Sequence, residues 1–593
     1  MQTNQLNSAK QQNKAQQLNN VQQLLTQHLG IWTSAETEKK SGRGRASGNL
    51  GSVYGIKKLR ELILELAVRG KLVPQDANDE PASELLKRIQ AEKAKLIAEG
   101  KLKKEKLLGL ISEDEKPFEL PIGWEWAKLS EVLEVINGRA YKKNEMLDTG
   151  TPLLRVGNLF TSNEWYYSDL ELEENKYIES GDLIYAWSAS FGPFIWSGER
   201  VIYHYHIWKL NIIDDSVLFK GFIYNYLLSI TEKIKSQGNG IAMLHMTKER
   251  MELLDIIIPP LAEQKRIVTK VNALMLLCDQ LENQHLNAAE AHETLVSELL
   301  ATLTQSQDVA DFNANWQRIY AHFDVLFTTQ ASIAALKQTL LQLAVMGKLV
   351  PQDPSDEPAS ELLKRIQAEK AKLIVEGKLK KEKPLAPIAE DEPFGLPKGW
   401  EWTTLSTLTI INPRDAANDD LKASFVPMTL IGTQFNEQHE HEVRTWKEIK
   451  QGFTHFAEGD IGVAKITPCF ENSKACVFKN LENGIGAGTT ELHVVRPLGD
   501  TLNQRYVLAY FKSPKFLEVG ESKMTGTAGQ KRLPKDFVEF NPFPLPPLAE
   551  QHRIVAKVDE LMVLCDQLKT RIQQASQQQQ WIADALVSKA VAI

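Results

Sequence analysis

Two stretches of the chain carry apolar residues in alternating steps of four and three, and each stretch follows a Pro-Pro pair. The first stripe runs through Ile267, Val271, Leu274, Cys278, Leu281, Ala288, Leu295 and Leu299, with His285 and His292 as polar interruptions. The second keeps the same phase through Ile554, Val558, Leu561, Cys565, Leu568, Ile572, Ala575, Ile582 and Leu586. This spacing is the heptad seam of a helix that packs against another helix. It predicts two helices of about 40 residues, each roughly 60 Å long.

The two stripes have each other as their simplest partner, which predicts an intramolecular antiparallel coiled coil. The alternative is that each long helix packs only on its own neighbouring domain. Two shorter, mostly apolar helices are expected at residues 59–68 and 336–345, because Gly70 and Gly347 follow them.

A loop rich in Pro and Asp follows the first short helix, and Ser83 is the expected N-cap of a further helix that stops at Gly100. This segment is locally basic, with Lys87, Arg88, Lys93, Lys95, Lys101, Lys103, Lys104 and Lys106. A solvated helical face explains these charges, and contact with DNA phosphates is the alternative.

Large parts of the chain occur twice. Residues 66–106 return at 343–383 with only Arg69, Ala77, Asn78 and Ala98 changed, and PPLAEQKRIVTKVNALMLLCDQL at 259–281 returns with few changes at 546–568. A repeated framework that alternates with two divergent inserts indicates one chain presenting two binding surfaces in one geometry.

A weaker echo links residues 28–33 with 322–328, displaced by the segment KKSGRGRASGNLGSVYG at 39–55. The composition of that segment is typical of a mobile basic loop, which either contacts DNA or a partner or serves as a plain linker.

Both inserts show an α/β pattern, with strands expected at 181–187, 203–212, 459–466 and 490–497 between Gly, Asp and Pro residues. Both open alike, PIGWEWAKLSEVL and PKGWEWTTLSTLT, and both close on a short apolar strand before Pro-Pro. We therefore expect an α/β fold class: two mixed α/β domains of one fold with different surfaces, separated by the long helices.

Bulk properties limit the class of protein. A chain of 593 residues is too long for one core. Its net charge of −7 means that any nucleic-acid site must be a local basic face. Cys278 and Cys565 occupy equivalent apolar positions, and no CxxC spacing supports zinc or a disulfide framework. The polar N-terminus and the lack of any apolar run near about 18 residues indicate a soluble, cytoplasmic protein without a membrane partner.

Candidate DNA contacts are the basic and polar residues of Gly-rich turns, because Arg and Lys suit guanine, Asn and Gln suit adenine, and backbone amides suit phosphates. The first insert offers Arg139, Tyr141, Lys142, Lys143, Arg155 and Asn158. The second offers Lys465, Thr467, Lys474, Gln530, Lys531 and Arg532.

The doubled PPLAEQ-x-RIV, the doubled LAVxGKLVPQ and the GD-x-I turns at Gly181 and Gly459 resemble the specificity (S) subunit of Type I restriction–modification systems. ITPCFENSK at 466–474, GTTEL at 488–492 and GTAGQKRLP at 526–534 resemble the usual core of its target recognition domain. The first insert departs from this core, with WSASFG and GNGIAMLHM in place of ITPCFE and GTAGQKRLP. The long repeat resembles the branch of the family labelled IB.

The resemblance implies that each α/β domain reads one half of a bipartite site in double-stranded DNA, while the long helices fix the gap and dock two methyltransferase subunits. It further implies restriction subunits in the same complex, and partners that use S-adenosylmethionine, ATP and Mg²⁺ for adenine methylation and restriction. No cofactor is expected on this chain. The expected segments are an N-terminal helical stretch with the Gly/Arg-rich loop at 1–58, a first helical repeat 59–106, a first target recognition domain 107–258, a spacer helix 259–303, a central helical region 304–383, a second target recognition domain 384–545 and a C-terminal spacer helix 546–593.

Signals for catalysis are weak. NPFP at 541–544 departs from the NPPF motif of amino-methyltransferases and fits an apolar strand better, and no GK pair has the upstream glycine of a phosphate-binding loop. His204 with His206, expected on one strand face, and His439 with His441, expected in an exposed loop, could hold a metal, although packing is the simpler interpretation. The sequence thus indicates a non-catalytic DNA-recognition subunit. A coiled-coil scaffold with two protein-binding modules is the alternative, and the missing motifs disfavour a self-contained nuclease or methylase.

Overall fold

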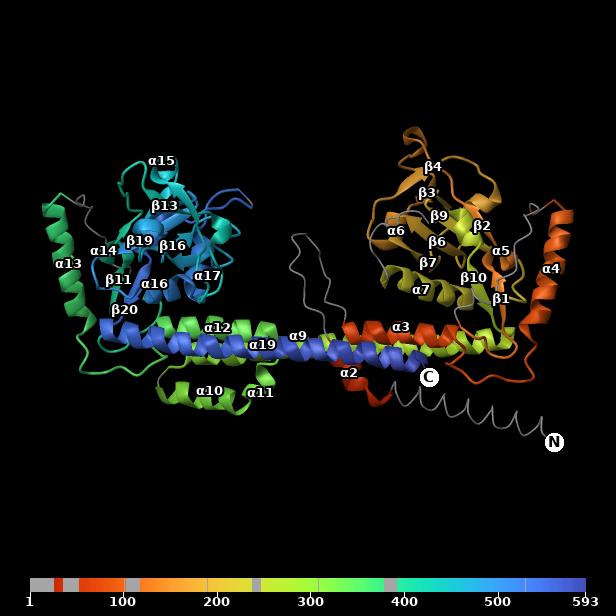
Figure 1. The fold of residues 1–593 in the computed structure, drawn as a ribbon, viewed down its shortest axis with the longest axis horizontal. Coiled ribbons are helices and arrows are strands. Elements are labelled where there is room, and N and C mark those ends of the chain that lie inside the picture. Colours follow the sequence, from red (N-terminus) through yellow and green to blue (C-terminus); the bar gives the residue numbers. More distant parts are fainter. Residues whose placement is uncertain are drawn as a thin grey trace. The chain divides into compact units, whose positions relative to one another are not determined.

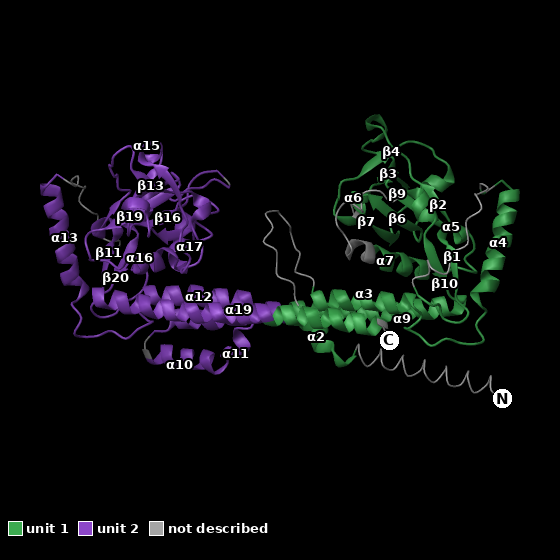
Figure 2. Ribbon diagram, viewed as in Figure 1, with its two compact units in different colours: residues 1–287, 575–593 green, residues 288–574 purple. Residues whose placement is uncertain are grey.

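The computed structural model of the protein describes residues 26–35, 53–100, 102, 118–188, 190–236, 247–307, 309–377, 392–527 and 529–592. It divides into two compact units, shown in Figure 2. The first unit holds residues 1–287 and 575–593, and the second holds residues 288–574. No helix within the described ranges combines the length and the apolar character that crossing a membrane requires.

The α/β domain of the first unit contains two four-stranded sheets. One has the order β2–β9–β6–β7, with every neighbouring pair antiparallel: β2 (Leu133–Asn137), β9 (Ile207–Ile212), β6 (Leu183–Ser188) and β7 (Ser190–Ile195). The other has the order β4–β3–β8–β5, with a parallel pairing between β3 and β8: β4 (Tyr166–Ser168), β3 (Thr151–Leu154), β8 (Val201–Tyr203) and β5 (Tyr177–Ile178). A separate ribbon pairs β1 (Glu125–Lys128) with β10 (Asp255–Ile258).

The second unit repeats this topology. Its sheets have the orders β12–β19–β16–β17 and β14–β13–β18–β15, and again the inner pair of the second sheet, β13–β18, is parallel. The strands are β12 (Thr409–Ile411), β19 (Leu492–Pro497), β16 (Ile461–Ala464), β17 (Ala475–Val477), β14 (Glu442–Thr445), β13 (Lys422–Val426), β18 (Ile485–Gly488) and β15 (Thr454–Ala457), and the ribbon joins β11 (Glu401–Thr404) to β20 (Pro542–Leu545). The predicted α/β class and the common fold of the two inserts are confirmed.

A helix layer connects each α/β domain to a helical base. In the first unit α7 (Lys220–Ser236) packs between β7 and α3 (Tyr54–Val68), as Figure 1 shows. In the second unit α16 (Gln504–Phe511) contacts β16, β17 and α12 (Gln330–Val345).

The long helices are α9 (Leu261–Gln305) and α19 (Leu548–Ala592), each 45 residues long. In the first unit Val271 and Cys278 of α9 share a core with Ala583 and Ala590 from the end of α19. In the second unit the other ends meet in one core, formed by Val296, Leu300, Leu303, Ile554, Val558 and Cys565. The antiparallel arrangement is therefore present in both units.

Each helix pair has a third helix, which the heptad pattern does not reveal. In the first unit Arg60 of α3 binds Asp279 and Glu282 of α9 at 2.7 and 2.8 Å, and the Tyr54 hydroxyl donates to Asp584 of α19 at 2.8 Å. In the second unit Lys337 of α12 pairs with Asp566 of α19, and Lys348 Nζ donates to the Thr304 carbonyl at 3.0 Å. Equivalent third helices, α3 in the first unit and α12 in the second, thus contact the paired long helices.

The seam departs from a strict heptad in the later half of each long helix. Ala288, Leu295, Ala575 and Ile582 were expected at buried positions but are not buried, and the next residues after Leu295 and Ile582, Val296 and Ala583, are buried instead. The earlier seam residues are buried or partly buried as predicted: Ile267, Val271, Leu274, Cys278, Leu281, Ile554, Val558, Leu561, Cys565 and Leu568. An α-helix has 3.6 residues per turn, so a buried face drifts by about 20° per heptad and moves on by one residue over a helix of this length.

Three local expectations also need correction. The basic helix α4 (Ala82–Ala98) has Pro81 as its N-cap, so Ser83 lies inside the first turn and makes no cap. The strand expected at 203–212 is two strands, β8 and β9, which belong to different sheets and meet at a turn. His204 and His206 therefore lie at that turn, and do not share one strand face.

The basic face of α4 is largely paired. Lys87 binds Glu84 at 2.7 Å, Arg88 binds Glu80 at 3.0 Å, and Lys93 Nζ donates to the Ser130 carbonyl at 2.7 Å. These contacts favour the solvated face over phosphate binding. Lys101, Lys103, Lys104 and Lys106, and nearly all of the loop at 39–55, lie outside the described residues. The echo further upstream corresponds to two short helices, α2 (Leu29–Ser34) and α11 (Phe323–Leu326), with His28 and His322 as their N-caps.

The repeated motifs bind one another, which explains why both copies carry them. In the first unit the Trp124 indole donates to Glu263 at 2.9 Å, Gln264 Nε2 donates to the Val217 and Pro259 carbonyls at 3.0 and 2.9 Å, and Arg266 binds Asp79 at 2.5 Å. In the second unit the same bonds join Trp400 to Glu550, Gln551 to the Pro546 carbonyl and Arg553 to Asp356. PPLAEQ-x-RIV is thus a structural joint between an α/β domain, its long helix and the Pro- and Asp-rich loop that carries Asp79 or Asp356.

Candidate nucleic-acid interface

Three connections of the first α/β domain meet at the ends of β2, β3 and β8. The backbone N–H of Arg139 donates to the Tyr203 carbonyl at 3.1 Å, and that of Tyr205 donates back to Arg139 at 3.0 Å. The N–H of His204 donates to the Leu154 carbonyl at 3.0 Å, which brings the neighbouring Arg155 to the same edge. The sheet topology therefore collects two arginines and the β8–β9 turn on one surface.

This turn carries a cluster of rings. His206 lies 5.1 Å from Trp187 and 4.0 Å from Tyr205, measured between ring centroids, and Tyr205 is 40% exposed. The Trp187 indole donates to the Tyr205 carbonyl at 2.9 Å, which fixes the turn against β6. Burial, with His206 and Arg155 nearby, lowers the pKa of His204 to about 4, so its imidazole is neutral at pH 7. Exposed aromatic rings beside cations can stack on bases and bind phosphates.

Sequence reasoning did not select Tyr205, His206 or Trp187 as DNA contacts. The alternation YHYH looked like a strand, and strand side chains of that composition usually pack. The available signal was the density of aromatic and histidine side chains in YHYH at 203–206.

The predicted residues of the first insert have different surroundings. Arg139 is bound by Glu145 at 2.7 Å and lies over the Tyr141 ring at 5.1 Å, whereas Lys142 and Lys143 are exposed. Tyr141 is only 9% exposed, and burial raises its pKa to about 12. Its hydroxyl is buried and has no hydrogen-bond partner among the described residues, so Tyr141 packs beneath Arg139 and does not present its hydroxyl at the surface.

Asn158 and Arg155 lie next to each other but differ in availability. The Asn158 amide accepts from the Arg155 N–H at 3.1 Å and donates to the Glu164 carbonyl at 2.8 Å, so both of its ends serve the local backbone. Arg155 is exposed and lies 5.1 Å from the Tyr166 ring. The Arg155 side chain therefore lies at the surface, whereas the Asn158 side chain holds the local backbone.

The second α/β domain builds a basic surface at the corresponding edge. The Thr467 N–H donates to the Lys531 carbonyl at 3.0 Å, and the Leu533 N–H donates to Lys465 at 2.7 Å, so the β16–β17 connection pairs with the segment after α17 (Pro514–Lys523). The Lys465 N–H donates to the carbonyl of Glu491 at 3.0 Å, in the β18–β19 connection that corresponds to the β8–β9 turn. Lys465, Lys531 and Arg532 are thereby brought together.

Arg532 is the best-defined cation of this surface. Its Nη2 and Nε donate to the Glu491 carboxylate at 2.9 and 3.0 Å, its side chain is 48% exposed, and the hydrogen bond lowers the pKa of Glu491. Lys531 and Gln530 are exposed.

Two other predicted residues of this insert are engaged internally. Thr467 is 8% exposed and its hydroxyl accepts the Lys531 N–H at 3.1 Å, and Lys474 Nζ donates to the Met428 carbonyl at 2.7 Å. Both contacts hold the loops in place.

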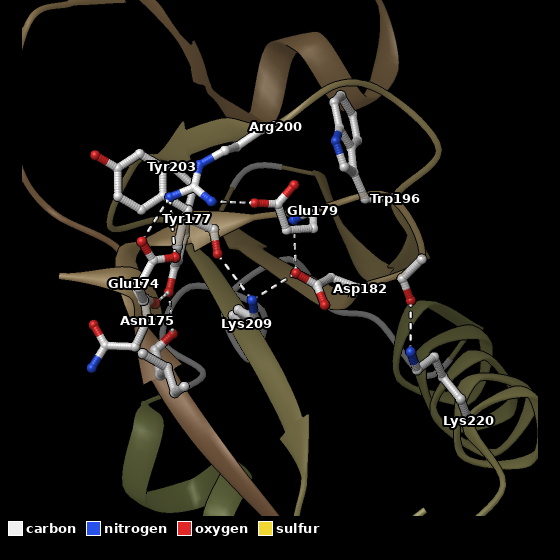
Figure 3. A network of polar contacts seen from close by, with 12 residues as sticks. Glu174, Asn175, Tyr177, Glu179, Asp182, Trp196, Arg200, Tyr203, Lys209 and Lys220 are labelled. Atoms are coloured by element: carbon white, nitrogen blue, oxygen red, sulfur yellow. Dashed lines mark hydrogen bonds and ion pairs between the residues drawn. The ribbon is translucent and has the colours of Figure 1, made fainter. Parts of the chain in front are cut away.

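A polar network joins the strands of the first α/β domain, as Figure 3 shows. Asp182 of the GD-x-I turn accepts the Glu179 N–H at 2.8 Å and binds Lys209 of β9 at 2.6 Å. Arg200 lies 4.0 Å from the Tyr177 ring and binds Glu179 at 2.6 Å. In the second unit Asp460 accepts the Ala457 N–H at 2.7 Å and binds Arg496 at 2.7 Å, and Arg496 also holds Asp415 at 2.8 Å. The repeated GD-x-I turn therefore ties neighbouring strands together in both domains.

Within the ranges that the structure describes, no three His, Cys, Asp or Glu side chains are arranged to hold a metal ion. His439, expected in an exposed loop, is 9% exposed, accepts the Lys479 N–H at 3.1 Å and lies 5.4 Å from the Phe478 ring. Burial lowers its pKa, so it is a packed neutral histidine. Cys278 and Cys565 are buried at 1% and 3% exposure, which confirms them as core residues.

Two α/β domains of one topology, each with its own basic loops and each joined to the same helical framework, define a chain with two distinct binding surfaces. A family model described as the Type I restriction modification DNA specificity domain matches residues 121–291. The specificity subunit of the Type I restriction enzyme EcoAI from Escherichia coli is 40% identical over an alignment that covers 96% of this chain and 99% of that protein. The EcoEI specificity subunit, also from Escherichia coli, is 38% identical with the same coverage. The chain belongs to the family of Type I restriction enzyme specificity subunits.

The more distant EcoBI specificity subunit from Escherichia coli is 19% identical over 78% of this chain. Among solved structures, a crystal structure of the HsdS subunit from Thermoanaerobacter tengcongensis is 19% identical and covers 80% of this chain and 98% of its own, with a TM-score of 0.36.

Proposed function

We propose that this chain is the non-catalytic DNA-recognition subunit of a Type I restriction–modification complex. Residues 107–258 and 384–545 act as two target recognition domains, and each reads one half of a bipartite, asymmetric site in double-stranded DNA. The observation that carries this proposal is the placement of different basic loops at the same edge of two sheets with one topology. Different side chains at equivalent positions read different bases.

The first surface contacts DNA through Arg139, Arg155, Lys142 and Lys143, with the Tyr205 ring available for an apolar or stacking contact. The second uses Arg532, Lys531, Lys465 and Gln530. Because the net charge of the chain is −7, these local cations direct DNA to two places instead of the whole surface.

The long helices are proposed to set the gap between the half-sites and to dock two methyltransferase subunits. Each repeat exposes a pair of large apolar residues at equivalent positions of its long helix: Leu276 and Leu277 at 57% and 53%, and Val563 and Leu564 at 49% and 47%. The two long helices expose apolar pairs at equivalent positions although the α/β domains differ in sequence, and such repeated patches suit two copies of one partner. Restriction subunits complete the complex in the cytoplasm, and S-adenosylmethionine, ATP and Mg²⁺ serve these partners in adenine methylation and restriction.

Exchange of one recognition domain tests the proposal. Residues 120–258 are replaced by the corresponding domain of another family member, and the complex with its methyltransferase subunits selects sites from a DNA library. We expect one half-site to change and the other to persist, because each domain has its own core and its own basic loops. The reciprocal exchange of residues 397–545 is the matched control, and it must change only the other half-site.

A simultaneous change of both half-sites would contradict the proposal that the two domains read their half-sites independently. Binding without any sequence preference would instead favour a scaffold whose α/β modules bind proteins.

A further inference from the structure

Lys512 is a buried lysine directly after α16, with 1% of its surface exposed. Its ammonium donates to the carbonyls of Ser473 at 2.7 Å, Thr433 at 3.0 Å and Gly432 at 3.4 Å. Three N–H donors thus meet three acceptors. A buried charge is costly unless hydrogen bonds satisfy it, so this geometry indicates that the lysine fixes the backbone around it.

The three carbonyls come from two connections of the second α/β domain. Ser473 ends the β16–β17 connection, which carries Lys465 at its start, and Gly432 and Thr433 follow the short helix η4 (Met428–Leu430). Lys474 ties the same two connections together, because its ammonium donates to the Met428 carbonyl. The far end of the β16–β17 connection pairs with Lys531, next to Arg532. Lys512 therefore anchors one end of a loop whose other end forms the proposed DNA surface.

The first α/β domain provides an internal comparison. Gln264 accepts the Phe219 N–H at 2.7 Å just as Gln551 accepts the Asn503 N–H at 2.8 Å. Phe219 and Asn503 directly precede α7 and α16. Within these two helices, the hydroxyls of Tyr226 and Tyr510 donate to the backbone of β10 and β20 at 2.8 and 2.9 Å. The same numbering offset puts Leu228 at the position of Lys512.

The connections differ in the same way. In the first domain Ser188 of β6 pairs directly with Ser190 of β7, so there is no loop to hold. In the second domain β16 ends at Ala464 and β17 begins at Ala475. The buried lysine occurs in the domain that has the long connection, and the leucine occurs in the domain with the tight hairpin.

We propose that Lys512 is a positioning residue for DNA reading by the second α/β domain. Its ammonium holds the 465–474 connection in the geometry that places Lys465, Lys531 and Arg532 against their half-site. This inference rests on the proposed function and names a residue for one half-site only, so the first half-site serves as its internal reference.

The contacts of the Lys512 ammonium with the three carbonyls depend on its protonation and therefore on pH. Burial lowers the pKa of Lys512 to about 8. The groups that face it are the Cys476 thiol, whose pKa burial raises to about 12, the Glu437 carboxylate and the Lys474 ammonium. Above pH 8 the neutral amine has two N–H donors for three carbonyls and no charge, so the loop is held less firmly. We expect discrimination at the second half-site to fall between about pH 7 and pH 9 while the first half-site is unaffected.

The experiment measures base discrimination at each half-site by selection from a DNA library, with the full chain in complex with its methyltransferase subunits. Lys512→Leu, which copies the first domain, should reduce discrimination at the second half-site by roughly 5- to 150-fold, the range that loss of one good base contact gives. Lys512→Arg should retain discrimination and remove its dependence on pH. Lys515→Leu removes an exposed lysine three residues away and is the matched control, expected to change neither half-site.

The pH series on the unmodified chain decides the question if Lys512→Leu does not fold. Equal pH profiles at both half-sites, or full discrimination by Lys512→Leu, would overturn the role of Lys512 while leaving the proposed function intact. Absence of any half-site selection by the unmodified complex would instead overturn the proposed function.

Discussion

Arg139 and Arg532 are both exposed enough to meet DNA, and both are bound by a glutamate of their own domain. Such a surface ion pair contributes only about 0–1 kcal/mol to stability, so its removal costs the fold little. Its effect is instead to hold a planar guanidinium in one orientation. The guanidinium N–H groups that the glutamate leaves available can then meet a guanine edge or a phosphate in a fixed direction.

Arg532→Ala should weaken binding of the cognate site by about 1–3 kcal/mol and relax selection at one position of the second half-site. The physical reason is the loss of a bidentate donor that the Glu491 carboxylate orients. Glu491→Gln should relax the same position, because the guanidinium loses its orientation. Site selection by the complex measures both effects.

Arg365→Ala is the matched control, since Arg365 forms a comparable exposed pair with Glu357 at 2.6 Å on the basic helix α13 (Ala359–Val375). A uniform loss of affinity for all sequences after Arg532→Ala would assign that residue to phosphate. Unchanged binding would remove it from the interface.

Single elements of this protein are fixed by contacts between repeated motifs. The helices α12 and α13 both end before a glycine with positive φ, Gly347 at 69° and Gly377 at 70°. Their surroundings differ: a Cβ on Gly347 would lie 2.5 Å from Pro397 and 2.8 Å from the Trp400 ring, whereas nothing lies within 4 Å of one on Gly377. Gly347 is therefore required both by the backbone and by the packing of the PKGW motif.

Gly347→Ala should lower the free energy of unfolding of the second unit by about 2–5 kcal/mol, combining left-handed backbone strain with overpacking. Gly377→Ala, the control with the same backbone conformation and open space, should cost only about 1–2 kcal/mol. Urea denaturation of the full chain measures both. Equal losses would show that the contact with Trp400 and Pro397 contributes nothing.

At the scale of the whole molecule, the chain consists of two units with one design, and α9 and α19 contribute residues to both. In each unit the two long helices run antiparallel and share a core with a third helix. The pairing is thus intramolecular, and the divergent α/β domains are inserted between its repeated elements. This arrangement lets a recognition domain change while the helical framework stays the same.

Lengthening both long helices by one heptad, after Leu281 and Leu568, should add about 10 Å to the paired helices. If these helices set the gap, the half-sites stay the same and the preferred gap grows by about three base pairs, at roughly 3.4 Å each. Binding is lost if the added turns rotate the domains out of register, because a heptad turns the buried face by about 20°. Site selection by the lengthened protein distinguishes these results.

A heptad inserted in α19 alone is the control, and it should disrupt the antiparallel seam and destabilise the protein. An unchanged gap at full affinity in the doubly lengthened protein would exclude α9 and α19 as the spacer and leave docking of the methyltransferase subunits as their role.

The sequence by itself determined the periodic and repeated features. Apolar periodicity predicted both long helices, and the doubled motifs predicted two equivalent α/β domains, because burial along one chain is a local property of residue order. Only the tertiary structure decided which candidate side chains are available. The side chains of Thr467 and Lys474 bond to backbone groups of other connections, Asn158 bonds to the backbone of its own connection, and the ring cluster around Tyr205 forms where two sheets meet. Most of those partners are distant in sequence, so no spacing along the chain encodes them.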